Sequence, residues 1–199
     1  MSLEIQEIKA RLRSEIKERL RAMSEAERRR QSVEIIRRIE THPVWQASKF
    51  VLFYAPLARE ADIWPLFDRA LAAKKRIALP RNVAEDDTYE LVEVRDAVRD
   101  CERGRFGVRE PKKRLPPIRI SQLDLILVPG LLFDHRGGRL GRGKGHYDRL
   151  LSQSAASFCG IAFAEQMVAE TPMGPHDVRM NCIVTPEGWL EASRSPVME

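Results

Sequence analysis

The chain has 199 residues, of which 43% are hydrophobic and 32% charged, and its formal net charge is +5. This length and composition predict one soluble globular domain and exclude a collagenous or wholly disordered chain. No apolar run reaches the roughly 18 residues that a membrane-spanning helix requires. The first residues alternate acidic and basic side chains without an apolar stretch, so we expect neither a secretory signal nor a membrane partner.

The three cysteines, Cys101, Cys159 and Cys182, lack the spacing of a zinc or redox motif. Such thiols are typical of small buried side chains in a reducing compartment, so we expect a cytoplasmic protein. The pI of about 9.3 indicates an anionic partner. Residues 101–119 carry the strongest local excess, with seven basic and two acidic side chains, and this attracts phosphate-rich small molecules as well as nucleic acid.

The N-terminal segment predicts two helices. Apolar side chains recur every three or four residues between positions 5 and 20, as on one helix face. Lys9 and Arg13 lie one turn apart on a neighbouring face. Ser24 and Glu27 form a capping box that begins the second helix. The predicted apolar stripe of that second helix consists of Val33, Ile36 and Ile39.

Short apolar runs farther along the chain predict strands of a covered sheet. They are residues 50–54, 76–80, 123–128, 158–163 and 182–184, with an alternating strand nearer an edge at 89–94 and helices at 63–73 and 146–152. This alternation predicts a single α/β domain over residues 1–199, with three α/β/α layers and a mainly parallel, Rossmann-like sheet. Residues 1–42 form its helical N-terminus, a hairpin within the same domain. Residues 104–120, with three prolines and two glycines, predict a long irregular loop.

The segment from Val128 to Leu151 reads VPGLLFDHRGGRLGRGKGHYDRLL and carries the predicted chemistry. Glycines let the backbone approach a ligand, and successive N–H groups before a helix form an anion cradle, so the predicted guest is phosphate. From Gly138 onward the sequence fits seven positions of a P-loop, but Gly145 replaces the Ser or Thr that binds Mg²⁺. The nearest candidate ligand for that ion is the carboxylate of Asp148.

Two function classes are compatible with a cationic, glycine-rich loop of this kind. The first is a P-loop-like NTPase or kinase of a small metabolite, which Gly145 and the strand ending in Pro129 disfavour. The second is a basic nucleic-acid-binding module, which presents exposed aromatic side chains among its cations. Aromatic residues make up only 7% of this chain and lie mostly in the apolar runs. We therefore expect a small-molecule partner and no nucleic acid.

The run P-G-x-x-F-D-x-x-G-x-R-L-G-R-G-K-G-x-Y-D-R-x-L, which begins at Pro129, resembles the signature of the 5-formyltetrahydrofolate cyclo-ligase family. The resemblance covers essentially the whole chain, because other segments also match. They are the K-x-x-x-R helix with R-x-M-S-x-x-E-R, Tyr54 to Glu60, Leu79-Pro80-Arg81, Phe106 to Pro111, His176-Asp177 and Val184-Thr185. His146 departs from the pattern, since the family often has a second tyrosine there.

The resemblance implies that 5-formyltetrahydrofolate and MgATP give 5,10-methenyltetrahydrofolate, ADP and phosphate. The formyl group on N5 is an amide, so its carbon is a poor electrophile. Phosphorylation of its oxygen would let N10 of the same molecule attack with the advantage of proximity. Phosphoryl transfer needs positioning and charge stabilisation rather than a protein nucleophile. The implied cofactors are ATP and Mg²⁺, the substrate carries one glutamate or several, and we expect a monomer.

The resemblance also implies the site residues. The nucleotide would contact Lys9, Arg13, Arg139, Leu140, Gly141, Arg142, Gly143, Lys144, Gly145, His146 and Tyr147. The folate would contact Tyr54, Ala55, Glu60, Arg142, Lys144 and Tyr147. Asp148 and Asp177 would hold magnesium, and Arg142 and Lys144 are the implied catalytic cations nearest the transferring charge.

Simpler interpretations of some of these side chains stay open from the sequence. Without the family match, Lys9 and Arg13 would read as a solvated stripe on a helix. Tyr147 could stack on the folate or belong to the core. Asp177 could cap a turn. The basic stretch Lys112 to Arg114 could meet the glutamate tail of the folate or lie in solvent.

Overall fold

The computed structural model describes residues 3–83, 88–104 and 107–192, so Phe106 of the matched motif lies outside the described residues. Helix α1 spans Leu3–Ala22 and helix α2 spans Glu25–Thr41. The predicted cap is confirmed, because the Ser24 hydroxyl accepts a 3.1 Å hydrogen bond from the Glu27 N–H. A short helix α3, Pro43–Ala47, follows at once, since the His42 ring accepts from the Val44 N–H.

The prediction for the buried face of α2 was wrong in one residue. Val33 is 62% exposed, whereas Ile35 is fully buried beside Ile36 and Ile39. Adjacent helical positions differ by about 100° in direction, so a stripe that includes Ile35 turns Val33 toward solvent. Val33 therefore lies on the side of α2 that faces solvent.

The centre of the molecule is an eight-stranded mixed sheet in the order β13-β12-β10-β7-β1-β2-β3-β6. Its strands are β1 Phe50–Leu52, β2 Arg76–Val83, β3 Thr88–Glu93, β6 Pro117–Ile118, β7 Leu125–Pro129, β10 Ser157–Ile161, β12 Cys182–Val184 and β13 Trp189–Glu191. The five strands from β12 to β2 are parallel, and β13, β3 and β6 add antiparallel edges. The predicted α/β fold with a mainly parallel sheet is confirmed.

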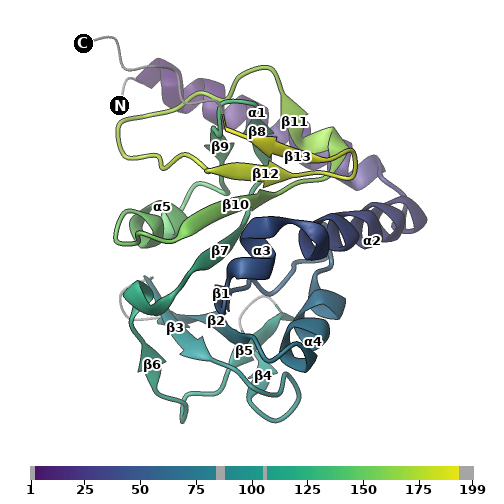
Figure 1. The fold of residues 1–199 in the computed structure, drawn as a ribbon. Coiled ribbons are helices and arrows are strands. Elements are labelled where there is room, and N and C mark those ends of the chain that lie inside the picture. The colour runs from purple at the N-terminus through teal and green to yellow at the C-terminus, as the bar shows by residue number, and fades with distance from the viewer. Residues whose placement is uncertain (1–2, 84–87, 105–106, 193–199) are drawn as a thin grey trace.

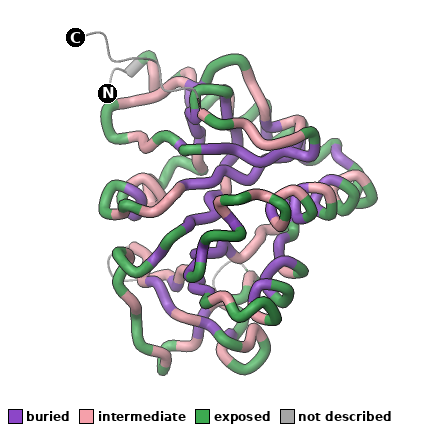
Figure 2. The backbone as a smooth tube through the Cα atoms, viewed as in Figure 1, coloured by how far each residue is buried: buried purple, intermediate pink, exposed green. Residues whose placement is uncertain are grey.

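The two faces of the sheet bury two hydrophobic clusters. Val51 pairs with Leu125 and points to one face, whereas Leu52 pairs with Ile126 and points to the other, as alternation along a strand requires. Helices α1 to α4, the last being Trp64–Ala72, cover the first face, and α5, His146–Leu151, covers the second together with loops. Figure 2 shows the buried residues running through this middle layer, so the three predicted layers are confirmed.

Two regions depart from the expected strand and loop pattern. The segment 104–120 is not one irregular loop, because it contains β5, Arg109–Pro111, and β6. β5 pairs with β4, Cys101–Arg103, and a 3-10 turn, Ile120–Gln122, follows β6. The glycine-rich segment also contains strands. They are β8, Leu132–Asp134, and β9, Arg139–Leu140, which form a small sheet with β11, Met167–Val168; a 3-10 turn, Ala164–Gln166, precedes β11.

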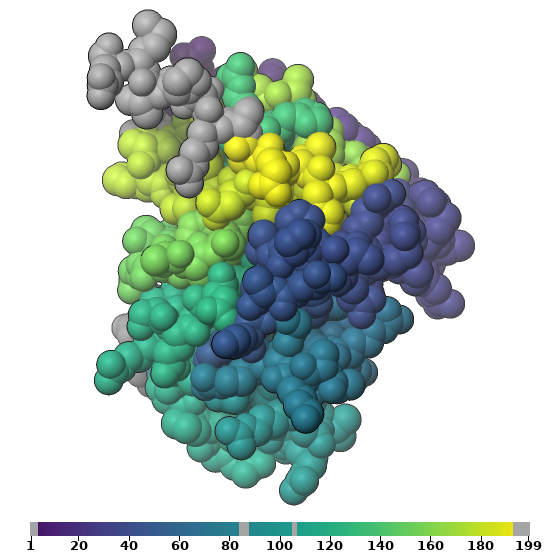
Figure 3. All heavy atoms as spheres, in the orientation of Figure 1, coloured from purple at the N-terminus to yellow at the C-terminus, as the bar shows by residue number. Residues whose placement is uncertain are grey.

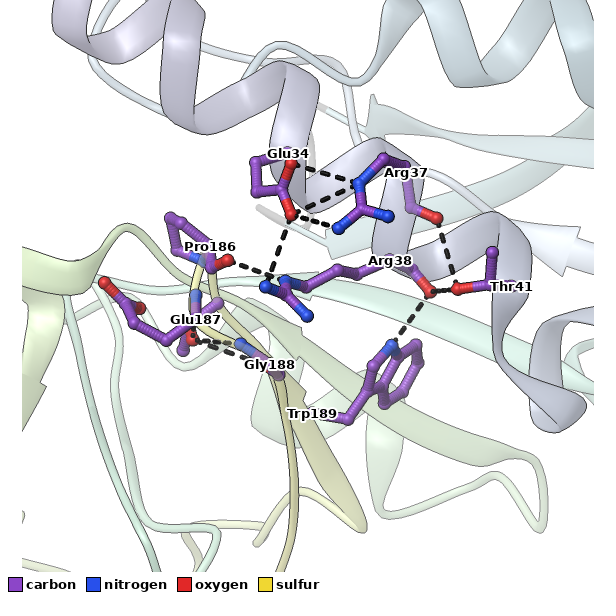
Figure 4. Close-up of polar contacts among 9 residues, drawn as sticks. Glu34, Arg37, Arg38, Thr41, Pro186, Glu187, Gly188 and Trp189 are labelled. Atoms are coloured by element: carbon purple, nitrogen blue, oxygen red, sulfur yellow. Dashed lines mark hydrogen bonds and ion pairs between the residues drawn. The ribbon is translucent and has the colours of Figure 1, made fainter.

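The C-terminal hairpin β12–β13 packs against α2, where the yellow and dark-blue surfaces meet in Figure 3. Figure 4 shows the polar contacts: the Arg38 guanidinium donates to the Pro186 carbonyl at 2.6 Å, and the Trp189 indole N–H donates to the Arg38 carbonyl at 3.0 Å. The Trp189 ring also stacks on His42 at 3.6 Å. Among the described residues, no helix is long and apolar enough to cross a membrane.

Candidate active site at the switch point of the sheet

The chain order places the topological switch point of the sheet between β1 and β7. From β1 the chain continues to β2 on one side, and from β7 it continues to β10 on the other. Loops leaving the carboxyl ends of two such strands diverge, which creates the usual ligand crevice of an open α/β sheet. Residues 53–60 leave β1 there, and the glycine-rich segment leaves β7.

One buried carboxylate fixes the glycine-rich segment to the following chain. Asp134, 1% exposed, accepts hydrogen bonds from the N–H groups of Arg136 and Gly138 at 2.8 and 2.9 Å. Its other oxygen accepts from the N–H and hydroxyl of Thr171 at 2.7 and 2.5 Å. Burial alone would raise the pKa of Asp134, but these hydrogen bonds outweigh it and lower the pKa. A side chain at Gly138 would collide with the same two residues, Asp134 and Thr171.

The residues after this hairpin form the exposed part of the loop. Arg142, Gly143 and Lys144 are exposed, between half-buried Gly141 and Gly145. Gly143 and Gly145 have positive φ values of 102° and 67°, which side-chain-bearing residues rarely adopt. Arg139 and Leu140 belong to strand β9 and are buried. The exposed loop is therefore shorter than the predicted phosphate loop, which began at Arg139. The strand also interrupts the continuous loop that the P-loop alternative requires.

Helix α1 brings one of its two predicted cations, Arg13, to this loop and the other, Lys9, to a buried ion pair. The Arg13 guanidinium donates to the Gly141 carbonyl at 3.0 Å and lies 3.4 Å from where a Gly143 Cβ would stand. Lys9 is only 3% exposed and forms an ion pair with Asp177. The alternative of a solvated helix stripe is therefore wrong for Lys9, and Asp177 does more than cap a turn.

A second ion pair lies beside the first. The Arg139 guanidinium donates to the Asp148 carboxylate at 2.9 Å, and the same carboxylate oxygen accepts from the Val178 N–H at 3.2 Å. Asp148 therefore lies beside the segment that carries Asp177, because Val178 directly follows Asp177 in the chain. Burial raises the pKa of Asp177, but the Gly174 N–H and the Lys9 ammonium outweigh this and lower it. The Asp177 carboxylate is therefore held in the ionised form.

These two carboxylates fit a magnesium ion that is completed by phosphate. Mg²⁺ prefers oxygen ligands and is commonly held by one or two carboxylates together with substrate phosphates and water. Among the described residues, no group of three or more His, Cys, Asp and Glu side chains could hold a metal by itself. The donor set of Asp148 and Asp177 therefore suits an ion that arrives with a nucleotide.

The predicted folate side of the site meets the loop through Glu60. Its carboxylate, 10% exposed, accepts from the Arg142 guanidinium at 2.8 Å and from the Leu57 N–H at 3.0 Å. Tyr54 is 3% exposed and donates its hydroxyl to the Ala61 carbonyl at 2.9 Å, and burial raises its pKa. Tyr54 therefore supports the segment 53–60 from the core, and Ala55, the next residue, is half-buried.

Aromatic side chains border the other end of the loop. Tyr147 packs against both hydrophobic clusters, so part of its ring belongs to the core, and its centroid lies 5.8 Å from the Arg139 guanidinium. Tyr89, on β3, lies edge-on to Tyr147 at 6.0 Å and to His146 at 4.8 Å. Tyr89 was not among the residues predicted from the sequence, because its only signal was its place at the start of an alternating strand.

Comparison with known proteins decides the family. The model of the 5-formyltetrahydrofolate cyclo-ligase family matches residues 5–186. This chain belongs to that family. A cyclo-ligase of Mycolicibacterium smegmatis is 36% identical over 153 residues, covering 74% of this chain and 79% of its own. The mouse cyclo-ligase is 29% identical over 181 residues, covering 85% and 89%.

The solved structures agree with the family. The 5,10-methenyltetrahydrofolate synthetase of Aquifex aeolicus superposes with a TM-score of 0.84 at 32% identity, covering 96% of both chains. The resemblance noted in the sequence is thereby confirmed. In this cyclo-ligase family member, one position of the signature is structural in character, because Asp134 ties the hairpin to the following chain. Gly138, which falls on an unspecified position of the signature, leaves room for that contact.

Proposed function

We propose that this chain is an ATP- and Mg²⁺-dependent 5-formyltetrahydrofolate cyclo-ligase. It would convert 5-formyltetrahydrofolate to 5,10-methenyltetrahydrofolate and release ADP and phosphate. The observation that carries the proposal is the 2.8 Å contact between Arg142 and Glu60, because it joins the cationic loop to the acid expected at the pterin. A nucleotide on the loop and a folate at Glu60 would lie side by side across the switch point.

The reaction needs an activated formyl oxygen. ATP, the co-substrate, supplies the phosphoryl group that makes this oxygen a leaving group, and Mg²⁺ neutralises phosphate charge when bound. N10 then forms a bond to the formyl carbon, the C–O bond breaks with phosphate as the leaving group, and the proton of N10 is released. N5, which carries the formyl group, and N10 belong to one molecule, so ring closure gains from proximity.

The side chains of this protein would bind and orient the reactants. Arg142 and Lys144, exposed on the loop, would stabilise charge on the transferring phosphoryl group. Lys9 and Arg13 would approach the phosphates from α1, and the backbone N–H groups of residues 141–145 would complete the cradle. Asp148 and Asp177 would hold Mg²⁺, while the Glu60 carboxylate would accept hydrogen bonds from N–H groups of the pterin.

A coupled assay tests the proposal. Purified protein is mixed with MgATP and 5-formyltetrahydrofolate, and the near-ultraviolet absorbance of the methenyl product is followed together with ADP release. We expect one ADP for each product molecule and no ADP without folate. ADP release that does not require folate would instead indicate a general NTPase, and tight RNA binding without turnover would indicate a nucleic-acid-binding module.

Lys144→Ala provides the sharper test, with Lys17→Ala as its matched control. Lys17 lies one turn beyond Arg13 on α1 and is exposed. We expect Lys144→Ala to lower turnover more than tenfold with an unchanged circular dichroism spectrum, and Lys17→Ala to keep the wild-type rate. A near-normal rate in Lys144→Ala would contradict the catalytic role. The monomeric state, the cytoplasmic location and the absence of a nucleic-acid partner stay predictions.

A further inference from the structure

The ion pair between Glu60 and Arg142 occupies the carboxylate that is expected to hold the pterin. Its Oε1 accepts from the Nε and Nη2 groups of Arg142 at 3.2 and 2.8 Å, and its Oε2 accepts from the Leu57 N–H at 3.0 Å. Two bonds fill the lone pairs of Oε1. The Glu60 side chain is only 10% exposed. A pterin N–H group that binds at Oε1 must therefore displace the guanidinium rather than water.

Arg142 is the donor that can leave this carboxylate. The bond from Leu57 belongs to a local turn, in which the Glu60 N–H also donates to the Leu57 carbonyl at 2.9 Å. Arg142 lies 82 residues farther along the chain, and its side chain is 44% exposed. Arg13 holds the carbonyl of the preceding residue, Gly141, at 3.0 Å. The guanidinium can therefore leave Glu60 by rotation of its own side chain while the backbone beside it stays fixed.

The pair joins two groups that are expected on different reactants. Glu60 would accept hydrogen bonds from the pterin, whereas Arg142 would meet the phosphoryl group of the nucleotide. The same crossed arrangement recurs nearby, because Lys9, expected at the phosphates, is paired with Asp177, expected at magnesium. Without reactants, these charged groups therefore satisfy one another.

We propose that separation of the Glu60–Arg142 pair couples the two substrates, so that nucleotide and folate each strengthen the binding of the other. This inference rests on the proposed function. A nucleotide phosphate that draws Arg142 away leaves Glu60 open to the pterin, and a pterin that takes Glu60 releases Arg142 to the phosphate. The first substrate thus separates the pair, and the second finds its partner already released. Linkage requires the same factor in both directions.

Equilibrium binding without turnover tests the coupling. Calorimetric titrations with 5-formyltetrahydrofolate are run on the wild-type protein alone and with saturating Mg²⁺ and adenylyl imidodiphosphate, an ATP analogue that does not transfer its γ-phosphoryl group. We expect the analogue to lower the Kd for folate about fivefold, the low end of the usual range of coupling, because a half-exposed ion pair is weak. Folate should lower the Kd for the analogue by the same factor.

Arg142→Gln separates coupling from a simple contact with the substrate. Without the pair, the Kd for folate in the absence of nucleotide should be lower than in the wild type, and the analogue should change it by less than about twofold. Weaker folate binding in this variant, both with and without the analogue, would overturn the proposal. Arg136→Gln is the matched control and should keep the wild-type coupling, because Arg136 is exposed on the same segment and lies 3.7 Å from Glu170.

Glu60→Gln tests the pair from the other side. The glutamine can still accept from the Leu57 N–H, but it releases Arg142, so the Kd for the analogue without folate should fall by about threefold. Asp62→Asn makes the same charge change at an exposed position nearby and should alter that Kd less. Equal nucleotide affinities in these two variants would overturn the proposal.

The wild-type protein keeps the two proposals apart. Turnover of 5-formyltetrahydrofolate together with a folate Kd that the analogue does not change would overturn the coupling and leave the proposed function intact. A protein that neither binds nor converts 5-formyltetrahydrofolate would overturn both.

Discussion

Replacing Asp134 with asparagine tests whether one buried carboxylate holds two segments of the site together. Asparagine has the same size and can still accept from the N–H groups of Arg136 and Gly138, but its amide faces the Thr171 N–H as a second donor. A buried N–H left without an acceptor costs about 1–3 kcal/mol. The two remaining bonds also lose their charge assistance, roughly 0.5–1 kcal/mol each. We therefore expect Asp134→Asn to lower the free energy of unfolding by about 2–5 kcal/mol.

Urea unfolding followed by circular dichroism at pH 7 measures this difference. Glu170→Gln is the control, because it removes an exposed carboxylate 3.7 Å from Arg136 and should leave the midpoint unchanged. The pKa of Asp134 is lowered in the folded protein. The carboxylate therefore stabilises the fold fully above its unfolded pKa, about 3.9, and this contribution is lost as the pH falls through the folded pKa. Equal stability of wild type and Asp134→Asn at pH 7 would refute the reasoning.

Two further predictions concern the core. In Gly160→Ala the new methyl would lie 2.6 Å from Cε1 of Phe133, so we expect a loss of about 1–3 kcal/mol in urea unfolding. Gly188→Ala, with nothing within 4 Å, should match or slightly exceed wild type, and equal midpoints for both variants would contradict this packing argument. Burial raises the pKa of Cys101 to about 11, so at pH 8 about one thiol in a thousand is the reactive thiolate. Iodoacetamide should label Cys101 far more slowly in the folded protein than in urea, and rapid labelling of the native thiol would show the site to be open.

The parts of the fold that the sequence predicts are those with a strong local pattern. The five parallel strands have short apolar runs, and the Ser24 cap has its own motif. The hairpin of β8 and β9 has no such pattern, because its strands are two or three residues long and depend on Asp134 meeting Thr171, 37 residues away. The prediction of one irregular loop over 104–120 failed because its strands are also only two or three residues long, and β6 pairs with β3, which lies farther back in the chain.

The site residues were predictable where the family motif names them, but their partners were not. Spacing alone suggested that Lys9 lies on a solvated face, and only the fold shows it buried against Asp177. Arg139 was expected on the phosphate loop, yet its guanidinium lies beneath the loop on Asp148. Tyr89 carries no motif, and its contact with Tyr147 depends on the antiparallel pairing of β3 with β2. Such contacts arise from tertiary packing, which a single sequence does not encode locally.

The ion pair between Lys9 and Asp177 joins positions 168 residues apart. During synthesis on the ribosome, α1 leaves the exit tunnel long before residue 177 has been added. Its buried ammonium must wait in water or with temporary contacts until nearly the whole polypeptide has emerged. A product of premature termination upstream of residue 177 would therefore lack the counterion of Lys9 and one of the two carboxylates expected to hold magnesium, and would be inactive however well its remaining strands assembled.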